Sequence, residues 1–137
     1  MTTDTETKVD LTHFIGKAQL NIMRSLCRGE EGEFFKGKIK EMETIIGNMA
    51  KTYETDGQGN AAIATLHYFR GGSDWWIIER DIEDDQLQAF GFACLNGDAQ
   101  NAEPGYISIE ELISYGVEID LYFTPKTIGE IKAIYNP

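Results

Sequence analysis

The sequence has few cysteines and no long apolar run. Two cysteines, Cys27 and Cys94, are too few for a disulfide framework or a four-cysteine metal site. No segment approaches the roughly 20 apolar residues that cross a bilayer. Residues 1–30 contain no continuous apolar stretch of the kind that forms a signal peptide. We therefore expect a cytoplasmic protein with reduced cysteines and no membrane contact.

Basic residues are also scarce, because 12 Lys and Arg stand against 23 Asp and Glu, a net charge of −11. Nucleic-acid binders rely on Lys and Arg to replace counterions on phosphates, so this composition argues against direct nucleic-acid binding. The imbalance is local: residues 74–120 contain 12 acidic residues and one base, Arg80. This stretch is either a solvated surface that aids solubility or a surface that attracts basic partners.

Apolar and aromatic residues make up 42% and 11% of the 137 positions, which is enough for one core. We predict a single α+β domain over residues 1–137, with a flexible tail at 1–8, a helical half at 9–53 and a sheet-containing half at 61–137. The sheet is expected to be mainly antiparallel, with about four strands. Two N-terminal helices pack against it, and short helices lie near the C-terminus.

Apolar residues recur at helical spacing in two N-terminal stretches. A second helix is predicted over 31–53, with a break near Gly47 as the alternative. Asp10 or Thr12 is expected to cap the first helix by accepting a free backbone N–H. The core-facing stripe of that first helix is predicted to be Leu11, Phe14, Ile15, Ala18, Ile22 and Leu26.

β-Branched and aromatic residues take over after residue 61, which is typical of strands. Trp75 and Trp76 fall on opposite faces of the second strand, so we expect that strand to be covered on both sides. A polar loop is predicted at 96–105. The strands are predicted at 62–69, 74–82, 87–95 and 117–123.

Two Ser/Thr-x-x-Glu patterns predict the starts of short C-terminal helices. Ser108 precedes Glu111 by three residues, and Thr127 precedes Glu130 in the same way. In such a capping box each side chain accepts a hydrogen bond from the other residue's backbone N–H.

Residues suited to catalysis are few. His67 could act as a general base for Cys94, or it could be a structural histidine in a strand. The acidic turn after residue 80 could hold a hard cation through oxygens, although it lacks the glycine and distal glutamate of an EF-hand. The sequence contains no phosphate-binding glycine loop and no zinc-protease motif. We therefore assign no catalytic, cofactor-binding or metal-binding residue.

A resemblance to a known family lies in the segments LHYF-RGGSDWWIIERD, AFGFACL and EPGYISIEELISYGVEIDLYFTPKTIGEI. Across residues 61–131 the chain resembles a widespread domain-of-unknown-function family of small bacterial and phage proteins, often carried on plasmids and other mobile elements. The most specific parts are G-Y-x-S-x-x-E-L from Gly105 to Leu112 and D-L-x-F-x-P-K from Asp120 to Lys126. The family has no established activity, so the resemblance implies only an accessory role in a phage or mobile element.

Two functional hypotheses follow. The first is a non-enzymatic interaction protein whose acidic segment docks on a basic protein surface, as a DNA mimic against host defence. The alternative is a small-ligand-binding protein or enzyme that uses the 96–105 loop. The sequence leaves the oligomeric state open. The candidate partner-binding residues are Asp74, Glu79, Asp81, Glu83, Asp84, Asp85, Asp98, Glu103, Glu118 and Asp120.

Overall fold

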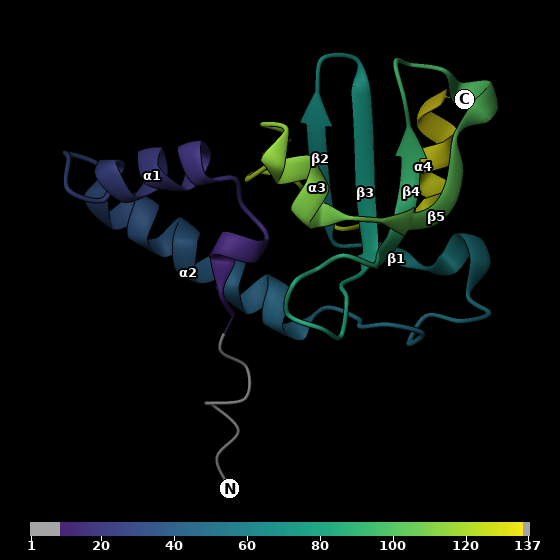
Figure 1. The fold of residues 1–137 in the computed structure, drawn as a ribbon, viewed down its shortest axis with the longest axis horizontal. Helices are drawn as coiled ribbons and strands as arrows, with labels where there is room; N and C mark the ends of the chain where they lie inside the picture. The colour runs from purple at the N-terminus through teal and green to yellow at the C-terminus, as the bar shows by residue number, and fades with distance from the viewer. Residues whose placement is uncertain (1–8, 136–137) are drawn as a thin grey trace, which may run out of the picture.

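The computed structural model describes residues 9–135 and places them in an α+β fold, as predicted (Figure 1). The predicted tail at 1–8 lies outside the described residues. The helices are α1 (Lys17–Leu26), α2 (Gly32–Asn48), α3 (Ile109–Ser114) and α4 (Ile128–Tyr135), with short 3-10 turns at Leu11–His13, Gly59–Ala61 and Ala99–Asn101.

The main sheet has five antiparallel strands in the order β5-β4-β3-β2-β6. A two-stranded sheet pairs β1 with β7. The strands are β1 (Ile63–Ala64), β2 (Leu66–Arg70), β3 (Ser73–Glu79), β4 (Ala89–Cys94), β5 (Glu103–Ile107), β6 (Glu118–Ile119) and β7 (Lys126–Thr127).

The strand predictions were wrong at three places. The predicted strand 62–69 is divided at Thr65 into β1, which pairs with β7, and β2, which belongs to the main sheet. The predicted loop 96–105 contains the start of β5, which the sequence hides because Pro104 and Gly105 are poor strand formers. The predicted strand 117–123 is reduced to β6, because the chain turns at Asp120, whose carbonyl accepts a hydrogen bond from the Phe123 N–H.

The first helix differs from its prediction because Gly16 is extended, with φ −58° and ψ 151°. The helical run therefore stops after the Leu11–His13 turn and restarts at Lys17. Leu11, Phe14 and Ile15 of the predicted stripe are buried as expected. The restart changes the phase, so α1 buries Leu20 and Met23 and leaves Ala18, Ile22 and Leu26 exposed. The second helix ends at Asn48, close to the break that the sequence offered as an alternative.

Helices cover both faces of the sheet, so β3 is covered on both sides as predicted. Trp75 packs against a core that contains residues of α1, α2 and α3. Trp76 belongs to a second core on the opposite face, which includes Ile128 and Ile131 of α4. The α1–α2 pair extends away from the sheet as an arm (Figure 1).

Candidate functional site

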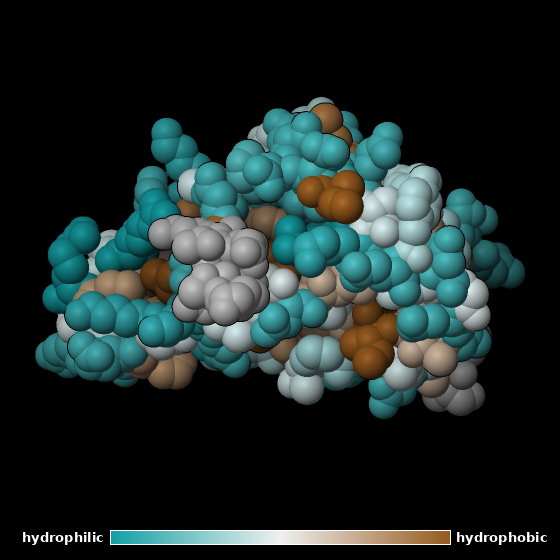
Figure 2. All heavy atoms as spheres, turned by 90° about the horizontal axis from the view of Figure 1, so that it is seen from below, coloured by the Kyte–Doolittle hydropathy of each residue, from teal (hydrophilic) through white to brown (hydrophobic). Residues whose placement is uncertain are grey.

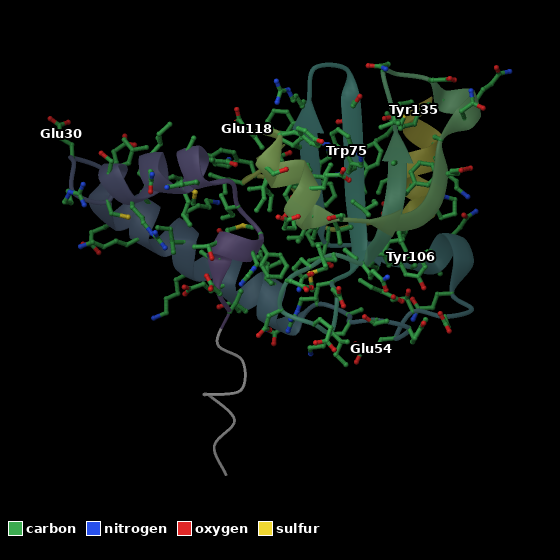
Figure 3. The ribbon with its side chains drawn as sticks, in the orientation of Figure 1. Glu30, Glu54, Trp75, Tyr106, Glu118 and Tyr135 are labelled. Carbon is green, nitrogen blue, oxygen red and sulfur yellow. The ribbon has the colours of Figure 1, made fainter. Side chains whose placement is uncertain are left out.

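The ten predicted partner-binding residues divide between two ends of the sheet. Asp74, Asp98, Glu103, Glu118 and Asp120 belong to the end with the β2–β3 hairpin, here called the hairpin end. Glu79, Asp81, Glu83, Asp84 and Asp85 belong to the opposite end, here called the connection end because residues 80–88 connect β3 to β4 there. The seven residues of β3 separate the two ends by roughly 20 Å. Figure 3 labels Glu118 near the hairpin end and Glu54 at the connection end.

Glu79 is a structural residue rather than an exposed one, since its side chain is buried. Its two carboxylate oxygens accept hydrogen bonds from the backbone N–H of Tyr53 at 2.8 Å and of Thr55 at 2.9 Å. The hydroxyl of Thr55 donates to the same carboxylate at 2.5 Å. This carboxylate therefore fixes the 53–55 turn, in which Tyr53 has a positive φ of 70°.

Asp81 is buried as well, and it shapes the start of the connection. Its carboxylate accepts hydrogen bonds from the backbone N–H of Glu83 at 3.0 Å and of Gln88 at 2.9 Å. The buried amide of Gln86 donates to the carbonyls of Asp81 and Glu83 and accepts from the Asp81 N–H. The predicted tight acidic turn is thus a longer loop that is held from within by Gln86. Sequence spacing gave no signal for this role.

His67 joins two of the predicted acidic residues. Its Nε2 lies 2.8 Å from an oxygen of Asp74, and its Nδ1 lies 3.2 Å from an oxygen of Asp120. The ring stacks on Trp76 with a centroid distance of 5.2 Å. A carboxylate oxygen thus lies within hydrogen-bond distance of each ring nitrogen. This arrangement ties β2, β3 and the turn after β6 together.

The hypothesis of a Cys94–His67 nucleophile pair gains no geometric support. Both ring nitrogens of His67 face carboxylates. Cys94 is buried, and the side chain of Tyr135 contacts it from α4. Burial, followed by hydrogen bonding to Cys94, raises the pKa of Tyr135. Cys94 and Tyr135 therefore lie together where α4 packs on the sheet.

Exposed acidic residues remain at the connection end, where the 80–88 connection lies beside residues 50–57. The Arg80 N–H donates to the carbonyl of Ala50, and the Ile82 N–H donates to the hydroxyl of Thr52. We call the combined surface the acidic surface. Its exposed acidic and large apolar residues are Tyr53, Glu54, Asp56, Ile82, Glu83, Asp84, Asp85 and Leu87, and we include the exposed Tyr106 of β5 with them.

Tyrosine and aliphatic side chains stand among these carboxylates. Tyr53 is 66% exposed and Tyr106 is 60% exposed, and the neighbouring Tyr53 side chain raises the pKa of Tyr106. Ile82 is 63% exposed. Figure 2 views the molecule from this end and shows hydrophobic side chains among hydrophilic ones. The surface therefore offers apolar contact area together with negative charge.

Arg80 is the single base in the acidic stretch, and it lies behind this surface. Burial lowers its pKa, while the nearby carboxylates Asp84 and Glu54 act in the opposite direction. Its Nε is buried and has no hydrogen-bond partner among the described residues. Arg80 carries a single positive charge beside several exposed carboxylates, so it neutralises them only in part.

A cavity of about 230 Å³ touches the loop of the alternative hypothesis. Pro104 at the end of the 96–105 loop lines it, together with Asp56, Asn60, Phe92 and Lys132. Lys132 donates a hydrogen bond to the side-chain oxygen of Asn60 at 2.8 Å. The cavity thus combines an aromatic wall with a few polar groups, which is a common composition of small-ligand sites.

Residues 9–135 contain no group of three or more His, Cys, Asp or Glu side chains placed to hold a metal ion. Within the same range, no helix combines the length and the apolar character needed to cross a bilayer. Comparisons of the chain with models of protein families, with curated proteins and with solved structures found no match.

Proposed function

We propose that the chain is a non-enzymatic, cytoplasmic accessory protein of a phage or mobile element that docks through its acidic surface on a basic protein. The partner of this proposal is a nucleic-acid-handling protein of the host defence. The carboxylates of the acidic surface occupy the place of DNA phosphates in the partner's basic cleft.

The observation that carries the proposal is the combination of groups on the acidic surface. Glu83, Asp84 and Asp85 are exposed and adjacent, so they attract a positively charged surface over several ångströms. Tyr53 and Tyr106 add large, stiff side chains of the kind that contribute most to binding energy at protein interfaces.

The test compares two variants that remove the same number of carboxylates at opposite ends of the sheet. The connection-end variant is E83Q/D84N/D85N, and its matched control is D98N/E103Q/E118Q. All six positions are exposed, so both variants are expected to keep the fold. The wild-type chain and both variants are immobilised and exposed to host lysate at low and at high salt. Captured proteins are identified by mass spectrometry.

We expect the wild-type chain and the hairpin-end control to capture the same basic nucleic-acid-handling protein at low salt. The connection-end variant should lose that protein, and high salt should weaken the capture because ions screen exposed charges. Equal capture by both variants, or capture that persists unchanged at high salt, would count against docking through the acidic surface.

The cavity beside Pro104 supports a second candidate function, which is binding of a small ligand. Its aromatic wall at Phe92 and its polar groups at Asn60 and Lys132 favour an uncharged aromatic molecule. Phenol is a suitable probe in a ¹⁵N-HSQC titration. Saturable shifts of the Asn60 and Lys132 amides, absent in a Phe92→Leu variant, would support this candidate. Shifts that stay linear with phenol concentration would exclude it.

A further inference from the structure

The helix α1 carries a second apolar stripe that the core does not use. Ala18, Ile22 and Leu26 repeat every four residues and therefore share one side of the helix. All three are exposed, Ile22 to 61% and Leu26 to 42%. The residues that α1 buries, Leu20 and Met23, lie on a different side. A helix of a monomeric protein ordinarily keeps polar residues on its outer side.

A groove runs beside this stripe. Its volume is about 480 Å³, within the range of sites that hold a ligand or a partner's side chains. Ile22, Met23 and Leu26 of α1 line it, together with Phe35, Ile113 and Leu121 from other parts of the fold. The exposed Ile22 and Leu26 side chains therefore also line the groove.

A β-strand of a partner cannot pair with the backbone of β6, the edge strand beside this groove. The side-chain amide of Gln19 donates to the carbonyl of Ile119 at 2.9 Å and accepts from its N–H at 3.0 Å. These two backbone groups are the ones that an incoming strand would use on β6. The occupant therefore has to bind through side chains.

The distribution of charge favours a second copy of this chain as that occupant. Residues 9–53 contain seven bases and six acids, whereas residues 54–137 contain four bases and fifteen acids. Two copies of so acidic a chain repel each other least when they meet through the helical half. The two charged residues that line the groove, Lys17 and Glu118, have opposite signs. Arg24 lies on another side of α1, where it lines a separate hollow.

We propose that two copies associate through α1 around a twofold axis, with the Ile22 and Leu26 side chains of each copy in the groove of the other. A twofold contact brings the same patch of both copies together, so it needs a surface that carries both ridge and hollow. The two α1 helices run antiparallel in this arrangement, and Ile22 lies near the axis. The acidic surface at the connection end takes no part in the contact.

The test is the oligomeric state of the full chain, measured by sedimentation velocity from micromolar to millimolar concentration. Ile22→Glu is compared with Ile134→Glu on α4, a position of similar exposure at 58%. We expect the wild-type chain and Ile134→Glu to form dimers and Ile22→Glu to stay monomeric. High salt should leave the dimer intact, which separates this contact from docking on a basic partner.

A disulfide cross-link checks the geometry. Ile22→Cys in a Cys27→Ser background is oxidised with diamide, and Ile134→Cys in the same background is the control. A covalent dimer is expected for the first variant only. A wild-type chain that is monomeric at every concentration would overturn the proposal. Dimers that survive Ile22→Glu would overturn it as well.

Discussion

The side chain of Gln19 pairs with the backbone of Ile119 through two hydrogen bonds, although 100 residues separate them. The amide therefore makes the two backbone hydrogen bonds that a neighbouring strand would make at the outer edge of β6. It also joins the arm formed by α1 and α2 to the sheet. The helical and sheet-containing halves are therefore connected by specific polar contacts as well as by the shared core.

Gln19→Ala should lower the free energy of unfolding by about 1–3 kcal/mol, because it leaves a partly buried N–H and C=O of Ile119 without partners. Urea denaturation measures the effect. Asn21→Ala, at an exposed position of the same helix, is the control for lost side-chain atoms. If the two variants unfold at the same urea concentration, the Gln19 contact contributes nothing to stability.

Gly91→Ala should destabilise the protein by about 3 kcal/mol, since an added Cβ would collide with the backbone carbonyl of Trp76 in the neighbouring strand. Gly105 pairs directly with Gly91 across β4 and β5, yet a Cβ there meets no atom within 4 Å. Gly105→Ala is therefore the matched control. Thermal melts of the two variants check the prediction, and equal melting temperatures would contradict it.

Asp74→Asn should cost about 1–3 kcal/mol of stability, because it removes the charged acceptor 2.8 Å from Nε2 of His67. Asp120→Asn should cost less, since its contact with Nδ1 is longer at 3.2 Å. Chemical denaturation gives the two values. Equal losses of stability in the two variants would contradict this ranking.

The capping box at α4 predicts a specific acid sensitivity. Hydrogen bonds from the backbone N–H and hydroxyl of Thr127 hold the pKa of Glu130 below its ordinary value of 4.5. A lowered folded-state pKa means that this carboxylate adds stability above the unfolded value and loses it as the pH falls through the folded value. Thermal melts over that acidic range should therefore fall less steeply for Glu130→Gln than for Glu118→Gln. If the melting temperatures of the two variants fall equally steeply with pH, protonation of Glu130 does not cause the loss of stability in acid.

Contacts between residues three positions apart could be predicted from the sequence. Ser108 accepts a hydrogen bond from the Glu111 N–H at 3.0 Å, and Thr127 accepts one from the Glu130 N–H at 3.1 Å. The Thr127 N–H also donates to the Glu130 carboxylate, so this pair confirms a complete capping box, whereas Ser108 and Glu111 show the N-cap hydrogen bond alone. Such motifs are predictable because they depend only on local backbone geometry. The opposite faces of Trp75 and Trp76 were predictable for the same reason.

Contacts that depend on the tertiary fold escaped prediction. Asp120 lies 53 residues from His67, and Glu79 lies 24 residues from Thr55. Nothing in the composition of the acidic stretch distinguishes buried Glu79 from exposed Glu83. The side of α1 that faces the core was also missed, since one extended residue, Gly16, resets the helical phase.

The separation of a nearly neutral arm from a strongly acidic body gives the molecule a permanent electric dipole. In the field of a positively charged target such a molecule rotates as it diffuses, so that its negative pole leads and the α1–α2 arm trails. Encounters would then be oriented before any contact forms, and the association rate would fall with ionic strength faster than the dissociation rate rises.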